Sequence, residues 1–347
     1  MAMRLRSLLR AAGRIPAADE RRLRDLFHEI ARAPRGDHVL PARLCSSLAS
    51  AYENLAHPGR LAFLSILSKQ EADADAIRHY CRELLVASEE DSARGAGALL
   101  RARSELREAL SPASERVIER LAQQPDGLRF LVSLRADLLA AMTDQRSAAG
   151  PTAPASTPVS SPAALEGEDG ERERWRGLDA SLRRQFGVWF DTGLLRLERL
   201  TWEHTPGALL ERIMAYERVH PFASWADLRS RLDGPRRALF AFLHPRLPGE
   251  PLVFVQVALV EQVPTRLRDV LPEQSSLAAC DEPQDRSASS NASSDEGYAS
   301  APGAPPAAPP PATARVACFY TISSPHAGLR GVPIGGLLIK QVCSDSF

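Results

Sequence analysis

One segment of this sequence has the composition of a phosphate-binding loop. It lies between a predicted strand and a predicted helix and consists of Arg330, Gly331, Val332, Pro333, Ile334, Gly335 and Gly336. Glycine has no Cβ atom, so the backbone of such a loop can approach a ligand closely. The first turn of a helix adds N–H groups without helical partners and a partial positive charge. The loop is therefore a candidate cradle for a phosphate or pyrophosphate group.

The loop does not fit the two commonest nucleotide-binding patterns. No Gly-Lys-Ser/Thr follows it, as a Walker loop requires, and its glycine spacing differs from the dinucleotide fingerprint. It resembles the Arg/Gln-Gly-x-Gly-x-Gly/Ala loop of the GNAT acetyltransferase fold, in which backbone amides bind the pyrophosphate of coenzyme A (CoA). Pro333 stands where many members of that fold have glycine; it removes one N–H donor but suits a first helical turn. A purely structural glycine loop is the alternative interpretation.

Three strands and one helix are predicted to position the loop. The β-branched run 252–260 predicts a strand, which pairs with the apolar run 238–243 as a hairpin across a Pro-Gly-Glu-Pro turn. Residues 315–323 predict a third strand, and residues 336–342 begin a helix. Because an open sheet of this size leaves an unpaired edge and an uncovered face, we expect an incomplete α/β domain.

The rest of the chain predicts helices. Leu23, Leu26, Phe27 and Ile30 share one helical face. Ser111 is predicted as the N-cap of a helix that opens at Ser111-Pro112, and Ser224 and Asp227 indicate the N-terminus of another before Leu228. Further helices are expected at about 41–56, 60–70, 75–88, 96–109, 128–139, 175–190 and 205–216. No strand is predicted before residue 236, so the fold class is α+β, an all-α bundle followed by the α/β domain.

Composition limits both the folded part and its partners. The 347 residues suffice for two domains, but segments 143–174 and 273–313 are rich in Ala, Pro and Ser and are predicted to be disordered insertions. With 43 basic and 43 acidic residues, no overall positive charge indicates a nucleic-acid partner. The five cysteines form no CxxC pair, which argues against a metal site. The longest apolar runs are too short to span a membrane.

The N-terminus has a pattern typical of a targeting segment. Residues 1–18 contain four arginines, no acidic residue and leucines at helical spacing, which resembles a mitochondrial transit peptide. An ordinary basic first helix is the alternative, and a cytoplasmic or peroxisomal location is then possible. The last three residues are not the peroxisomal Ser-Lys-Leu.

Five segments, in order, resemble the malonyl-CoA decarboxylase family. They are residues 126–139, 197–202, 219–221, 248–253 and 328–340. The likeness covers about residues 40–142, 175–272 and 314–342. It implies a helical oligomerisation domain over 19–142 and the N-terminal part of a GNAT-like catalytic domain over 175–347. It also implies homo-oligomers and the conversion of malonyl-CoA to acetyl-CoA and CO2 in fatty-acid metabolism, without a metal or organic cofactor.

The resemblance supplies no catalytic residue. In the family, a serine in Ser-Pro-x-Pro-Gly-Phe and a histidine in Asn-Pro…Phe-His follow the helix that begins at Gly336, and this sequence has neither segment. We therefore expect residues 1–347 to bind CoA thioesters through the loop but to give little or no turnover. Two alternatives stay open, a non-catalytic helical oligomerisation partner and a CoA-dependent acyltransferase. His220 is expected to be structural, and His326 a solvated loop residue.

Overall fold

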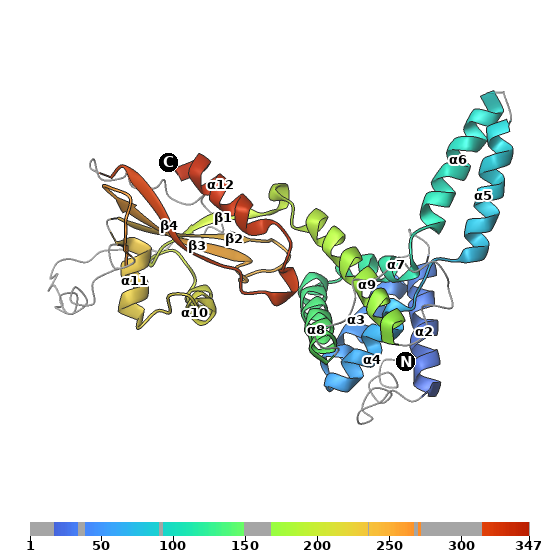
Figure 1. The fold of residues 1–347 in the computed structure, drawn as a ribbon, viewed down its shortest axis with the longest axis horizontal. Helices are drawn as coiled ribbons and strands as arrows, with labels where there is room; N and C mark the ends of the chain where they lie inside the picture. Colours follow the sequence, from blue (N-terminus) through green and yellow to red (C-terminus); the bar gives the residue numbers. More distant parts are fainter. Residues whose placement is uncertain are drawn as a thin grey trace, which may run out of the picture. The chain divides into compact units, whose positions relative to one another are not determined.

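The computed structural model describes residues 17–33, 39–89, 93–148, 168–234, 236–266, 270–271 and 314–346. Contacts between residues divide the chain into two compact units (Figure 1). The first unit joins Met1–Trp189 to His326–Val332, and the second joins Phe190–Pro325 to Pro333–Phe347. Helices form the first unit, and an antiparallel sheet with helices forms the second, so the predicted α+β class is confirmed.

The first unit is built from amphipathic helices around an apolar core. Leu23, Leu26, Phe27 and Ile30 are all buried, as their helical spacing predicts. The ring of Phe27 meets that of Phe63 edge-on at 5.4 Å. The helices are α2 Ala17–Arg32, α3 Val39–Glu53, α4 His57–Ser68, α5 Ala74–Glu89, α6 Ala93–Ala109, α7 Ala113–Ala122, α8 Gly127–Ala148 and α9 Glu168–Trp189. The short 3-10 helix η5, Ala327–Leu329, joins this unit by packing against α8.

Helices α5 and α6 form a hairpin that extends away from the rest of the first unit (Figure 1). They pack mainly against each other. Leu85, Val86 and Leu100 on this hairpin are each more than 60% exposed. The hairpin therefore presents apolar side chains that its own unit does not cover.

The second unit contains one four-stranded antiparallel sheet in the order β1-β2-β3-β4. The predicted hairpin of β2 and β3 and the third predicted strand, β4, are confirmed. The elements are η2 Thr192–Leu194, β1 Arg196–Leu200, α10 Gly207–Tyr216, α11 Trp225–Asp233, β2 Arg237–Leu243, β3 Val253–Val260, β4 Val316–Ser323 and α12 Ile334–Ser346.

The two faces of the sheet are covered by different helices (Figure 1). On one face, Ile213 of α10 and Leu228 of α11 pack with Leu239 and Phe254 of the sheet. Helix α12 lies against the other face, where it packs mainly on β3. Both faces of β3 are buried in this way, which explains its almost continuous apolar sequence.

Three sequence predictions need correction. Strand β1 precedes residue 236, where none was predicted; its sequence Arg-Leu-Glu-Arg-Leu lies at the sheet edge and is only partly buried, so its apolar pattern is weak. Ser111 does not cap α7, because Pro112 occupies the N-cap position without a side-chain bond. The ends of the predicted insertion 143–174 are helical, since α8 continues to Ala148 and α9 begins at Glu168.

Other predictions hold or lie outside the described part of the chain. Ser224 caps α11, its hydroxyl accepting a hydrogen bond from the N–H of Asp227 at 3.1 Å. Residues 1–16, 149–167 and 272–313 lie outside the described residues. All of the second predicted insertion and all but the last two residues of the predicted transit-peptide segment fall in those ranges. The contacts of α9 place it in the first, helical unit. The sequence pattern had instead assigned residues from 175 onward to the C-terminal domain.

Candidate functional site

The first half of the glycine loop continues directly from η5 within the first unit. The N–H of Arg330 donates to the carbonyl of Ala327 at 3.1 Å, and that of Val332 donates to the carbonyl of Leu329 at 3.0 Å. Between them Gly331 has φ of +80°, a backbone conformation that costs any residue with a Cβ atom. The chain turns sharply at Gly331, and Arg330 and Gly331 are exposed.

The second half of the loop forms the first turn of α12 in the second unit. Helix geometry leaves the N–H groups of Ile334, Gly335 and Gly336 without acceptors one turn earlier in the helix. Ile334 is buried and anchors the turn. Gly336 is exposed, and a Cβ atom built on it meets nothing within 4 Å. The predicted helix N-terminus is therefore present, with one side open at Gly336.

A buried arginine fixes the segment that leads into the loop. Arg135 in α8 is 1% exposed. Its Nε donates to Asp179 Oδ1 at 2.8 Å and its guanidinium donates to the carbonyl of Gly328 at 2.6 Å. Gly328 lies so close to α8 that an added Cβ atom would be 1.9 Å from the carbonyl oxygen of Val132. These contacts, all within the first unit, dock η5 onto α8.

Arg135 was not predicted as a site residue. Its sequence signal is a charged residue inside the apolar run of 128–139, where a helix face would otherwise be continuous. Its partners are 44 and 193 positions away in the sequence. A single sequence does not reveal which carboxylate and which carbonyl it meets.

The two histidines singled out in the sequence lie in different settings. The His220 N–H donates to Glu217 at 3.0 Å, and its carbonyl accepts from Arg231 at 2.8 Å. Its ring lies 6.4 Å from that of Tyr320. These contacts fit the structural role predicted for His220. His326 is half-buried rather than solvated, and its carbonyl accepts from the N–H of Leu329 at 2.9 Å.

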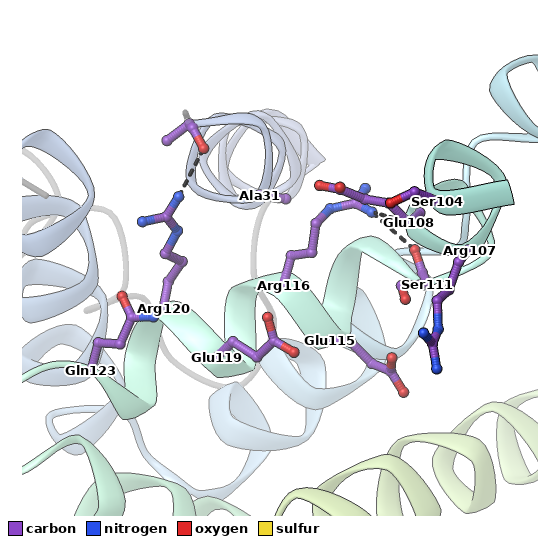
Figure 2. A pocket seen from close by; sticks show the side chains of 11 residues that line it. Ala31, Ser104, Arg107, Glu108, Ser111, Glu115, Arg116, Glu119, Arg120 and Gln123 are labelled. Atoms are coloured by element: carbon purple, nitrogen blue, oxygen red, sulfur yellow. Dashed lines mark hydrogen bonds between the residues drawn. The ribbon is translucent and has the colours of Figure 1, made fainter. Parts of the chain in front are cut away.

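The first unit also contains an open cavity of about 530 Å³ beside α6 and α7 (Figure 2). Arg116 donates to the carbonyl of Ser111 at 3.0 Å, and Arg120 donates to the carbonyl of Ala33 at 2.8 Å. The charged residues that line the cavity are Arg107, Arg116, Arg120, Glu108, Glu115 and Glu119. Because these charges balance and two of the arginines hold backbone carbonyls, the cavity is a poor match for a polyphosphate.

Two kinds of site are missing from the described residues. No group of three or more His, Cys, Asp or Glu side chains is placed to hold a metal ion. No helix in the same ranges combines the length and apolarity needed to cross a membrane.

Both halves of the chain match models of one protein family. The malonyl-CoA decarboxylase C-terminal domain matches residues 193–298 and 304–346, which include the glycine loop. The malonyl-CoA decarboxylase N-terminal domain matches residues 71–190, which include α8 and α9. The chain belongs to the malonyl-CoA decarboxylase family. The resemblance inferred from the five sequence segments is thereby confirmed.

Relatives in this family align with most of the chain. A mitochondrial malonyl-CoA decarboxylase of Anser anser anser is 30% identical over 274 residues, which are 79% of this chain and 43% of the relative. That of Mus musculus is 31% identical over 253 residues, 73% of this chain and 40% of the relative. The chain thus spans about two fifths of the length of these curated relatives.

Solved structures of malonyl-CoA decarboxylases have a similar fold. The enzyme from Rhodopseudomonas palustris gives a TM-score of 0.63 at 28% identity, covering 94% of this chain and 62% of the other. The enzyme from Agrobacterium vitis gives 0.64 at 27% identity, covering 93% and 62%. The described elements therefore correspond to part of the architecture of this decarboxylase family.

Proposed function

We propose that this chain binds malonyl-CoA and acetyl-CoA through the loop Arg330–Gly336 and belongs to a protein that decarboxylates malonyl-CoA. The supporting observation is the left-handed Gly331 followed by the N-terminus of α12, within the residues that match the decarboxylase C-terminal domain. Oriented N–H groups and a helix N-terminus suit a pyrophosphate. Arg330, in the part of the loop that belongs to the first unit, is exposed and positively charged.

The chemistry expected of the family divides into binding and proton transfer. Loss of CO2 from malonyl-CoA leaves an enolate of the thioester, which needs stabilisation of its oxygen and a proton at the α-carbon. The loop would supply the binding of the CoA phosphates. That residues 1–347 alone give little or no turnover stays a prediction, as does the absence of a metal or organic cofactor.

Gly336 allows a test that separates charge from folding. An added side chain at this position meets open space, and Asp in the first turn of a helix stabilises the helix. Gly336→Asp would place a negative charge beside the proposed phosphate position, whereas Gly336→Asn is a neutral control of equal size. We expect wild-type protein to bind CoA in isothermal titration calorimetry and Gly336→Asn to bind more weakly, because its side chain takes up space beside the proposed phosphate position. Gly336→Asp should bind at least about tenfold more weakly than Gly336→Asn, because it adds a negative charge there.

Two outcomes would refute the proposal. One is the absence of CoA binding by the wild-type chain at millimolar concentrations. The other is equal binding by the Asp and Asn variants, which would place the phosphates away from the N-terminus of α12. An acyltransferase is disfavoured because the helical first unit matches the decarboxylase N-terminal domain over residues 71–190.

Self-association and a mitochondrial location belong to the same proposal. The exposed apolar side chains of Leu85, Val86 and Leu100 on the α5–α6 hairpin support a homo-oligomer formed through the helical unit. Sedimentation of the wild-type chain and of Leu100→Lys tests this, and equal molecular masses for the two proteins would refute it.

The curated relatives from Anser anser anser and Mus musculus are named as mitochondrial. Imaging of a tagged chain with and without residues 1–18 tests the predicted transit peptide.

A further inference from the structure

A buried carboxylate connects three segments of the second unit. Glu217, just after α10, is 3% exposed. Its Oε1 accepts hydrogen bonds from the N–H groups of Val219 at 2.9 Å and His220 at 3.0 Å. Its Oε2 accepts from Gln256 Nε2 of β3 at 2.9 Å and from Ser323 Oγ of β4 at 3.0 Å. Among the described residues, Glu217 forms no ion pair, and its hydrogen-bond donors are neutral N–H, amide and hydroxyl groups.

The same carboxylate lies beneath an irregularity in β4. Gln256 pairs with Thr321, but the next residue, Val257, pairs with Phe319, so Tyr320 is an extra residue in β4. Two residues of β4 therefore face Gln256. The Tyr320 hydroxyl donates to Gln256 Oε1 at 2.9 Å, and Thr321 Oγ1 lies 3.4 Å from Glu217. The bulge is held by one chain of hydrogen bonds that ends at Glu217.

The side chain of Ile322 at the end of β4 is 43% exposed and lies near Gly335 of the glycine loop, on the opposite face of the strand. Ile322 lies between Thr321 and Ser323 in the strand, so its side chain points away from Glu217. A Cβ atom built on Gly335 would lie 3.8 Å from Ile322 Cγ2. Glu217 therefore holds two residues of a strand end, and the partly exposed residue between them, Ile322, lies near the first turn of α12.

We propose that Glu217 is a positioning residue for the phosphate-binding loop. It fixes the bulge and the last residues of β4, and through Ile322 it sets where the first turn of α12 rests on the sheet. This inference rests on the proposed CoA binding and assigns a role in it to a residue outside the loop. Glu217 does not itself contact ligand.

The direction of the hydrogen bonds explains why a carboxylate is required. Glu217 Oε2 accepts from Gln256, which turns the amide so that its oxygen accepts from Tyr320. In Glu217→Gln, an amide nitrogen in place of Oε2 would face the Gln256 nitrogen, which is a second donor. If Gln256 then reversed, Tyr320 would lose its acceptor. The exchange Glu217→Gln/Gln256→Glu moves the carboxylate to position 256, where it accepts both from the amide introduced at position 217 and from Tyr320.

The test compares these variants with a control that loses stability elsewhere. Ile213 is fully buried in the apolar cluster of α10 and contributes no side-chain hydrogen bond; Ile213→Ala is therefore the control. We expect Glu217→Gln to weaken CoA binding about tenfold in calorimetry. We expect the double variant to recover most of that loss, and Ile213→Ala to bind like wild type although it melts at a lower temperature.

Hydrogen exchange supplies a readout that does not depend on CoA. Glu217→Gln should accelerate amide exchange in peptides covering 316–323 and 333–340 more than in those covering α10 and α11. Unchanged exchange in both loop-side peptides, or equal loss of affinity in Glu217→Gln and in Ile213→Ala, would overturn the inference. If wild-type protein fails to bind CoA while Glu217→Gln still loosens 333–340 selectively, the proposed function fails but the positioning role stands.

Discussion

Replacing Arg135 by methionine should destabilise the first unit strongly. The side chain is 2% exposed and makes charge-assisted bonds to Asp179 and to the carbonyl of Gly328. Methionine retains most of the apolar stem but removes both donors. Removal of one partner from a buried ion pair costs about 3–5 kcal/mol. We expect a loss in this range, which corresponds to a melting temperature lower by roughly 6–20 °C for a unit of this size.

The control is an ion pair whose arginine is exposed. Arg184 on α9 pairs with Glu115, and its side chain is 67% exposed. The two acids are similarly exposed, 17% for Glu115 and 18% for Asp179, so the pairs differ mainly in the burial of the arginine. Arg184→Met should lower the free energy of unfolding by about 1 kcal/mol or less, because a guanidinium that stays largely in water contributes little. Urea unfolding followed by circular dichroism at 222 nm measures both variants, and the difference between them isolates the effect of burial.

The loss of Arg135 should also have a local effect, on the segment that contains η5. Because Arg135 holds the carbonyl of Gly328, its loss should also accelerate amide exchange in residues 326–332 under conditions where the helices stay folded. An Arg135→Met protein within about 1 kcal/mol of wild type would refute the reasoning, since the partly buried Asp179 and the buried Gly328 carbonyl would then tolerate the loss of their donor.

Three further predictions follow from the contacts described. Gly328→Ala should lower the free energy of unfolding by about 1–3 kcal/mol, because its Cβ atom would overlap the Val132 carbonyl. Gly336→Ala, whose Cβ atom meets open space, should leave the stability unchanged or raise it slightly. Equal melting temperatures for the two variants would contradict this. Burial raises the pKa of Tyr320 to about 12, so the unfolded chain loses this proton first and stability should fall between about pH 10 and 12. Urea titrations should show a decline smaller by about 1–3 kcal/mol in Tyr320→Phe than in wild type, and parallel pH profiles would exclude the effect. Burial also raises the pKa of the Cys45 thiol to about 12, so a thiol reagent at pH 8 should label the exposed Cys81 and Cys343 first; labelling of Cys45 at their rate in folded protein would contradict its burial.

Local patterns were sufficient to predict most elements of the fold. Helical spacing identified the apolar face of α2, and the β-branched run identified β3. The Ser224 cap was predictable because a cap is a bond between residues three positions apart. The glycine loop was predictable for the same reason, since a turn before a helix N-terminus is specified by consecutive residues. In each case the partners are close in the sequence.

Contacts between residues that are distant in the sequence decided the features that local patterns did not predict. Strand β1 is weakly apolar and is a strand because Arg196–Leu200 pairs with β2. Arg135 and Glu217 are ordinary charged residues in the sequence, and their importance comes from partners 193 and 106 positions away. The sequence by itself determined the helices, the hairpin and the loop, because these depend on local conformation and hydrophobic spacing. Only the tertiary structure decided how the loop is held, because burying a charge requires donors or acceptors that the folded chain brings together.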